Sequence, residues 1–269
     1  RGFEWFLLDR WLHGESFSIA AHHGEVRKLE FDPTGRWLAS LGADREVRVW
    51  NAVDGTLARA WAPHPFAVHA LAFHPKEPWL ATAGDETTIR LWNVNTGNMI
   101  REFVGHALTI HGLAFAPDGQ TLATGGADGV IRVWNVADGS LLRWLVLDPR
   151  ARKPPPAPPE PPDRQPWTQI AWLGFGFEGE RLVALGSNGS VGVWRTSDGA
   201  LLKVVDPLED PTKKVALESK GRFLWGYSLN GEVAQLDLES GVWRALRKSE
   251  REQRLGNWND LAVTRDGER

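Results

Sequence analysis

Apolar and polar residues alternate along most of the chain in short runs that are separated by turn residues. Runs such as VHALAFHP and IHGLAFAP alternate with a period of two, which predicts buried strands. A turn then leads into a second short run, WLAS or TLAT, and a tight turn with Asp-Gly or Asn-Gly chemistry leads into VIRVW as a third. A looser run, GSLLRWLVL, predicts a fourth strand. The pattern therefore predicts units of four short strands.

This four-strand unit recurs along the chain with a fixed period. The segments LASLGADREVRVWN, LATAGDETTIRLWN and LATGGADGVIRVWN carry Trp50, Trp92 and Trp134, which are 42 residues apart. A fourth segment, LVALGSNGSVGVWR, carries Trp194 after a step of 60 residues, and a fifth, LWGYSLNGEVAQLD, has Leu236 in the tryptophan position. Four short strands in such a period are typical of a propeller blade.

The longer fourth step contains a proline-rich run at residues 149–166. Its excess over the period is 18 residues, and the repeat continues in phase on both sides. We therefore predict a loop insertion within one domain rather than a boundary between two domains. The run also has the Arg152-x-x-Pro155-x-x-Pro158 register of a polyproline ligand, so a docking segment is the alternative to a plain spacer.

The repeats resemble the WD-repeat (WD40) family of β-propellers. The resemblance implies an all-β fold of four-stranded antiparallel blades, in a six- to seven-bladed or a truncated ring. The expected propeller domain covers residues 15–269, with repeats at about 22–63, 64–105, 106–148, 166–207 and 208–250 and a partial repeat at 257–269.

The resemblance also implies a hydrogen-bonded tetrad of His, Ser or Thr, Asp and Trp inside each blade. Three repeats offer a full set, with Glu replacing Asp in the second, where Asp85 is its neighbour. These sets are His22, Ser40, Asp44, Trp50; His64, Thr82, Glu86, Trp92; and His106, Thr124, Asp128, Trp134. The fourth and fifth repeats have lost the set, with Pro166, Ala184, Asn188, Trp194 and Leu208, Gly226, Asn230, Leu236 in its place.

The recurrence of these polar sets favours a structural role over a catalytic one. A nucleophilic site needs one arrangement of Ser, His and Asp, whereas here the same set recurs three times at the same spacing. GFGFEG at 174–179 matches a phosphate-loop pattern, but its last glycine is the ordinary turn glycine of the repeat and no helix is predicted after it. We therefore expect no catalytic residues and no cofactor.

The lead-in segment, residues 1–14, has its own pattern. Trp5, Leu8, Trp11 and Leu12 lie on one face of a short predicted helix, although FEWFLLD also fits the third strand of a preceding blade. The segment resembles the stretch ahead of WD repeats in multidomain bacterial serine/threonine kinases. That resemblance implies that the chain is the C-terminal region of a larger signalling protein.

Composition narrows the classes of function. A net charge of −3 gives no basic face for nucleic acid, and no apolar run approaches the length of a membrane span. The absence of cysteine excludes disulfides and fits a reducing compartment, so we expect a monomeric domain in the cytoplasm.

The leading hypothesis is a non-catalytic scaffold for a protein or peptide partner. By family geometry, the loops before the first strand of each repeat and between its second and third strands share one face. Candidate contact residues there are Glu25, Arg27, Phe66, His69, Asp85, Leu108, His111, Trp167 and Gln169. The alternative is a small-molecule or metal-dependent site at the channel mouth. His69 and His111 occupy equivalent positions there with Arg27, but no third metal ligand is evident.

Overall fold

The computed structural model describes residues 19–147, 168–207, 212–218, 221–228 and 233–245. The predictions made for the lead-in segment 1–14, the proline-rich insertion 149–166 and the partial repeat 257–269 lie outside the described residues. The same holds for Pro166, Trp167, Leu208 and Asn230.

The described residues form five antiparallel sheets of four strands each, and in every sheet the strands follow one another in chain order. We call the sheets blades 1 to 5. Blade 1 contains β1 (Val26–Phe31), β2 (Trp37–Gly42), β3 (Val47–Asn51) and β4 (Leu57–Trp61), and blade 2 contains β5 (Val68–Phe73), β6 (Trp79–Gly84), β7 (Thr88–Asn93) and β8 (Met99–Val104). Blade 3 contains β9 (Ile110–Phe115), β10 (Thr121–Gly126), β11 (Val130–Asn135) and β12 (Leu141–Val146).

The last two blades follow the same plan. Blade 4 contains β13 (Ile170–Gly176), a single 3-10 turn η2 (Phe177–Gly179), β14 (Arg181–Gly186), β15 (Val191–Arg195) and β16 (Leu201–Val205). Blade 5 contains β17 (Thr212–Leu217), β18 (Phe223–Ser228), β19 (Val233–Asp237) and β20 (Val242–Ala245). The predicted all-β fold class is confirmed.

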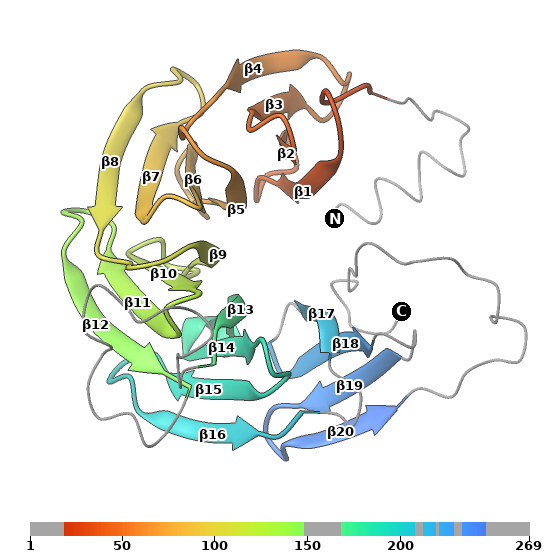
Figure 1. Cartoon of the computed structure of the whole chain (residues 1–269), viewed down its shortest axis with the longest axis vertical. Coiled ribbons are helices and arrows are strands. Elements are labelled where there is room, and N and C mark those ends of the chain that lie inside the picture. Colours follow the sequence, from red (N-terminus) through yellow and green to blue (C-terminus); the bar gives the residue numbers. More distant parts are fainter. Residues whose placement is uncertain (1–18, 148–167, 208–211, 219–220, 229–232, 246–269) are drawn as a thin grey trace, which may run out of the picture.

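The five blades lie in an arc around a common centre (Figure 1). The first strand of each blade, β1, β5, β9, β13 or β17, is nearest the centre, and the fourth strand is at the outside. The first strands of neighbouring blades pack side by side around the centre. Each blade therefore has one end made of the loops before its first strand and between its second and third strands, which we call the loop face. The opposite end, made of the turns after the first and third strands, is the turn face.

The core consists of four apolar layers, one between each pair of neighbouring blades. The layer between blades 2 and 3, for example, contains Ile89 and Phe103 of blade 2 and Ile110 and Leu122 of blade 3, all fully buried. Equivalent layers join blades 1 and 2, 3 and 4, and 4 and 5. Because burial of each such side chain stabilises the fold by about 1.5–3 kcal/mol, packing between blades is the main favourable contribution.

A basic side chain on the outer strand adds a polar bond between neighbouring blades. Arg101 Nη2 on β8 donates to the carbonyl oxygen of Ala137 in blade 3 at 2.7 Å, and Arg143 Nη1 on β12 donates to that of Thr196 in blade 4 at 2.9 Å. Arg59 and Lys203 make the corresponding bonds to Asn95 and Glu239. The turn between the third and fourth strands of one blade is thus held by the blade before it.

Candidate functional site

In blade 3 the structure brings the four side chains of the tetrad into one hydrogen-bonded chain. Trp134 Nε1 donates to Thr124 Oγ1 at 2.9 Å, and this oxygen is 2.7 Å from His106 Nε2. His106 Nδ1 is 3.1 Å from Asp128 Oδ2. Because the carboxylate of Asp128 can only accept, the proton of the neutral imidazole lies on Nδ1, so Nε2 accepts from the hydroxyl of Thr124, which itself accepts from the indole of Trp134.

The first two blades contain the same arrangement. In blade 1, His22 Nδ1 is 2.9 Å from Asp44 Oδ1, and His22 Nε2 and Trp50 Nε1 both lie 2.8 Å from the hydroxyl of Ser40. In blade 2, His64 Nδ1 is 2.9 Å from Glu86 Oε2, so the longer carboxylate reaches the same partner. Thr82 Oγ1 is 2.9 Å both from His64 Nε2 and from Trp92 Nε1.

An arginine that the sequence patterns did not single out completes each set. Arg132 Nη1 lies 2.7 Å from Asp128 Oδ2, and Arg90 Nη1 lies 2.7 Å from Glu86 Oε2. In blade 1, Arg48 is farther away, at 3.9 Å from Asp44, and pairs mainly with Glu46 at 2.7 Å. The sequence does contain a signal for this arginine, since an arginine stands two residues before the tryptophan in the first three repeats and is missing from the last two.

Burial sets the charge state of the blade 3 group. Burial lowers the pKa of His106, which keeps the imidazole neutral against the effect of the neighbouring carboxylate. Burial alone would raise the pKa of Asp128, but its hydrogen bond from His106 and the positive charge of Arg132 outweigh that effect and lower the pKa to about 2. The buried group is therefore a neutral histidine beside an Asp–Arg ion pair.

His74 is a fourth buried histidine, on the turn face. Its Nε2 donates to the carbonyl oxygen of Gly119 in blade 3 at 3.0 Å, and its Nδ1 accepts from the backbone N–H groups of Lys76 and Glu77 at 3.1 and 2.9 Å. Burial lowers its pKa. Protonation of His74 would place a proton on Nδ1, which could then no longer accept the hydrogen bonds from Lys76 and Glu77.

Because of these buried histidines, we predict that the protein loses stability in mild acid. Burial is the main reason that the pKa values of His64, His74 and His106 are lowered, so the folded state binds fewer protons than the unfolded state. Their stabilising contribution is complete above about pH 6.5 and is lost as the pH falls through the lowered values. Asp128 adds a second loss at lower pH, as the pH falls from 3.8 toward about 2. Urea unfolding at a series of pH values measures both steps.

The variant His74→Asn is the control for this pH dependence. An asparagine oxygen accepts the two backbone bonds at all these pH values, so the variant should show a shallower loss of stability in the first step. A first step of unchanged size in His74→Asn would contradict the assignment of part of that step to His74.

Blade 4 fills the place of the tetrad with apolar groups. Gly192 stands where blades 1 to 3 have the arginine, and a Cβ there would lie 2.4 Å from Leu147 Cδ1 and 2.3 Å from Trp194 Cη2. Ala184 replaces the hydroxyl residue and is fully buried. Asn188 binds within its own turn, where its Oδ1 accepts from Ser190. Leu147, at the end of the outer strand of blade 3, is the replacement that the sequence did not reveal.

Blade 5 also lacks the tetrad among its described residues. Leu236, in the tryptophan position, is fully buried, and Gly226, in the hydroxyl position, is buried as well. As far as their residues are described, both blades therefore keep the apolar layers without the polar group.

On the loop face the structure brings three of the candidate contact residues together. His69 Nε2 on β5 lies 2.8 Å from Asp85 Oδ1 in the β6–β7 turn, and the rings of His69 and His111 are 5.7 Å apart. The hydroxyl of Thr109, which the sequence patterns did not indicate, lies 3.4 Å from the same Asp85 oxygen. Burial, and secondarily the charge of His69, lowers the pKa of His111. This group, which we call the His–Asp cluster, spans blades 2 and 3.

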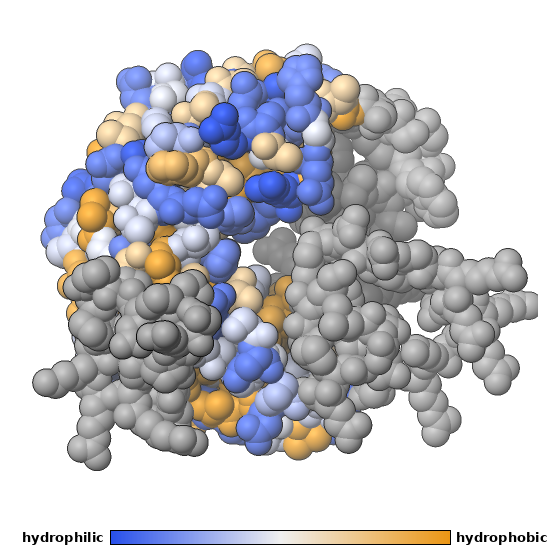
Figure 2. Space-filling model, in the orientation of Figure 1, coloured by the Kyte–Doolittle hydropathy of each residue, from blue (hydrophilic) through white to orange (hydrophobic). Residues whose placement is uncertain are grey.

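The remaining candidates lie at the same ends of the blades. Glu25 and Arg27 are exposed at the start of blade 1, and Phe66, just before β5, is 58% exposed. Leu108 and Gln169 are half-buried just before β9 and β13. On the face seen in Figure 2, hydrophilic residues predominate over blades 1 and 2, with smaller hydrophobic areas between them.

The His–Asp cluster does not have the arrangement of a metal site. Within the described ranges, no group of three or more His, Cys, Asp or Glu side chains is placed to hold a metal ion. The ring nitrogen of His69 that faces the cluster is already bonded to Asp85.

No helix among the described residues is long and apolar enough to cross a membrane.

Comparison with known proteins matches the first three blades to a repeat family. The model of the "WD domain, G-beta repeat" matches residues 15–51, 55–93 and 97–135. These ranges contain the three full tetrads, so the polar sets and the family match coincide. Such repeat domains generally serve as scaffolds for protein interactions and are typically non-catalytic.

The curated relatives match over about one repeat. The "Ribosome biogenesis protein ERB1" of Coccidioides immitis is 59% identical over 34 residues, which are 13% of this chain and 4% of that protein. The protein of the same name from Emericella nidulans is 56% identical over 34 residues, again 4% of its length. The chain thus spans a very small part of these relatives. They lend no support to the kinase resemblance of residues 1–14.

Proposed function

We propose that this chain, which carries WD40 repeats within five four-stranded blades, is a non-catalytic scaffold that binds a protein or peptide on its loop face. The observation that carries the proposal is the His–Asp cluster with the exposed Phe66 nearby in the chain. Asp85 is 45% exposed at its side chain and His69 28%, so both present polar atoms to a partner.

The buried tetrads support this proposal because their histidines are not accessible to a substrate. The side chains of His22, His64 and His106 are 0% exposed, so none of them reaches a substrate. The polar groups of the His–Asp cluster, in contrast, combine exposure with fixed positions. An exposed aromatic side chain on the same face as fixed polar groups is a common composition of a protein-binding surface.

Removing the loop-face groups should weaken partner capture. In the triple variant Phe66→Ala/His69→Ala/Asp85→Ala, proteins retained by the immobilised chain from a lysate of the source cells should fall about tenfold. Stability should change little, because exposed pairs such as His69–Asp85 contribute about 1 kcal/mol or less. Quantitative mass spectrometry of the retained proteins gives the readout.

The matched control removes exposed apolar groups elsewhere. Leu57→Ala/Leu141→Ala changes side chains on the outer strands β4 and β12 that are 50% and 46% exposed. This control should retain the same proteins as the unaltered chain. Equal recovery with the loop-face variant would eliminate the loop face as the binding surface.

The setting of this module is a separate proposal. The resemblance of residues 1–14 to the segment ahead of WD repeats in bacterial serine/threonine kinases supports a place at the C-terminal end of a larger signalling protein. The full-length parent sequence tests it: kinase motifs of the HRD and DFG type upstream are the expected result, and a parent without them would refute it.

A further inference from the structure

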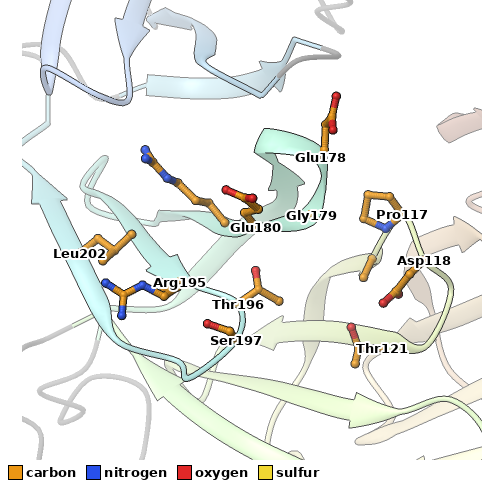
Figure 3. A pocket seen from close by; sticks show the side chains of 12 residues that line it. Pro117, Asp118, Thr121, Glu178, Gly179, Glu180, Arg195, Thr196, Ser197 and Leu202 are labelled. Atoms are coloured by element: carbon orange, nitrogen blue, oxygen red, sulfur yellow. The ribbon is translucent and has the colours of Figure 1, made fainter.

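A cleft opens between blades 3 and 4 on the turn face, away from the His–Asp cluster. Its volume is about 740 Å³. Figure 3 shows that blade 3 contributes Pro117, Asp118 and Thr121, from the β9–β10 turn and the start of β10. Blade 4 contributes the β13–β14 turn, the β15–β16 turn and Leu202 of β16. The cleft therefore lies at the opposite ends of the strands from the proposed partner surface.

The contact between the turns of blades 3 and 4 differs from the contact between the turns of blades 2 and 3. In blade 2, the ring of His74 packs against Gly119 of blade 3, where a Cβ would lie 2.5 Å from the ring. One repeat later, Ala116 takes the place of His74 and Gly179 takes the place of Gly119. The ring of Pro117 lies against Gly179 instead, where a Cβ would be 2.9 Å from its Cδ, and the cleft opens beside this smaller contact.

The blade 4 wall of the cleft is a strained turn. Phe177 and Glu178 have φ angles of 50° and 54°, in a region that residues other than glycine rarely adopt. In blades 1 and 5 the equivalent turns are closed by Asp32 and Glu218, whose side chains accept backbone hydrogen bonds. Gly176 occupies that position in blade 4 and has no side chain to do so. Strained backbone of this kind is characteristic of binding sites.

The charges around the cleft select one class of occupant. Asp118, Glu178 and Glu180 line it and are exposed. Of the two lining cations, Arg195 is paired with Asp198 at 2.7 Å, whereas Arg181 lies 3.9 Å from the centre of the Phe177 ring and keeps its positive charge, so the three carboxylates outnumber the lining cations. Ala116, Pro117 and Leu202 supply apolar wall. The surface is thus complementary to a positive charge carried next to an apolar group.

We propose that this cleft is a second binding site, which takes a peptide segment with a lysine or arginine beside an apolar residue. The basic side chain enters between the turns of blades 3 and 4 and meets the carboxylates of Asp118 and Glu180. The apolar neighbour packs on Pro117 and Leu202. This site does not depend on the loop-face proposal, since the two surfaces share no residue.

Selection from a displayed library of random seven-residue peptides tests the proposal on the full chain. Peptides enriched on the unaltered chain should carry lysine or arginine. Two variants should each weaken the binding of the enriched peptides about tenfold. Ala116→His fills the cleft with the side chain that blade 2 uses at this position, and Asp118→Lys/Glu180→Lys reverses its charge.

Two controls show whether peptide binding depends on this cleft alone. Glu77→Lys reverses one carboxylate charge in the β5–β6 turn of blade 2, outside the cleft, and should leave peptide binding unchanged. The loop-face triple variant should also leave it unchanged, so that failure of one proposal is distinguishable from failure of the other. Absence of enriched basic peptides, or enriched peptides that bind both cleft variants as well as the unaltered chain, would overturn the proposal.

Discussion

Replacing Asp128 with alanine is expected to lower the free energy of unfolding by about 3–5 kcal/mol, because it leaves a buried positive charge without its partner. The side chain of Asp128 is 0% exposed and that of Arg132 only 10%. The carboxylate also accepts the backbone N–H groups of Ala107 and Val130 and the ring of His106. Its removal therefore strands several donors at once. Urea unfolding at pH 7.5 measures the loss.

Asp44→Ala is the matched control in blade 1. The side chain of Asp44 is 13% exposed, and Arg48 keeps its closer partner Glu46 when Asp44 is removed. The expected loss is therefore smaller, about 1–2 kcal/mol. Asp128→Asn, which keeps an oxygen for His106 but removes the charge facing Arg132, should fall between the two. Equal losses in Asp44→Ala and Asp128→Ala would show that the buried ion pair does not set the size of the effect.

Replacing Gly84 with alanine should cost about 3 kcal/mol, since the new methyl group has no room. A Cβ at this position would lie 2.0 Å from the carbonyl oxygen of Ala67 and 2.7 Å from the Cα of Val68. Both are backbone atoms that cannot turn away. The same oxygen accepts the N–H of Asp85 at 2.9 Å, so a shift would also disturb the loop that holds the His–Asp cluster. The midpoint of thermal unfolding gives a direct measure.

Gly35→Ala separates the effect of space from that of conformation. Gly35 has a φ of 72°, but a Cβ there would have nothing within 4 Å. Its replacement should cost only the penalty for a left-handed residue, about 1 kcal/mol. If the two alanine variants lose the same stability, the collision at Gly84 is not the dominant contribution.

Two kinds of interaction thus stabilise the arrangement, one within blades and one between them. The tetrads close individual blades from within, whereas the apolar layers and the outer basic side chains join each blade to the next. Blades 4 and 5 keep their apolar layers although Ala184 and Gly192 of blade 4 and Gly226 and Leu236 of blade 5 stand where the first three blades have polar side chains or tryptophan. The chain can therefore vary the interior of a blade without losing the arrangement of the blades.

The sequence by itself determined the strand order, the period and the members of the three tetrads. These features are local: each tetrad lies within about thirty residues of chain, and alternation along a strand directly reports which side of the sheet is buried. Gly35 and Gly119 each stand 15 residues before the tryptophan of their repeat, and both have the positive φ that such turns need.

The contacts and spaces between neighbouring blades were evident only from the tertiary structure. Nothing in the sequence around Ala116 indicates a cleft, because its walls come from segments of blades 3 and 4 that lie about sixty residues apart in the chain. In the same way, Leu147 and Gly192 come from neighbouring blades and fill one space jointly. A side chain that lies between two blades contacts residues of both. The alternation along one strand shows which side chains are buried, but it does not show which residues of the next blade they contact.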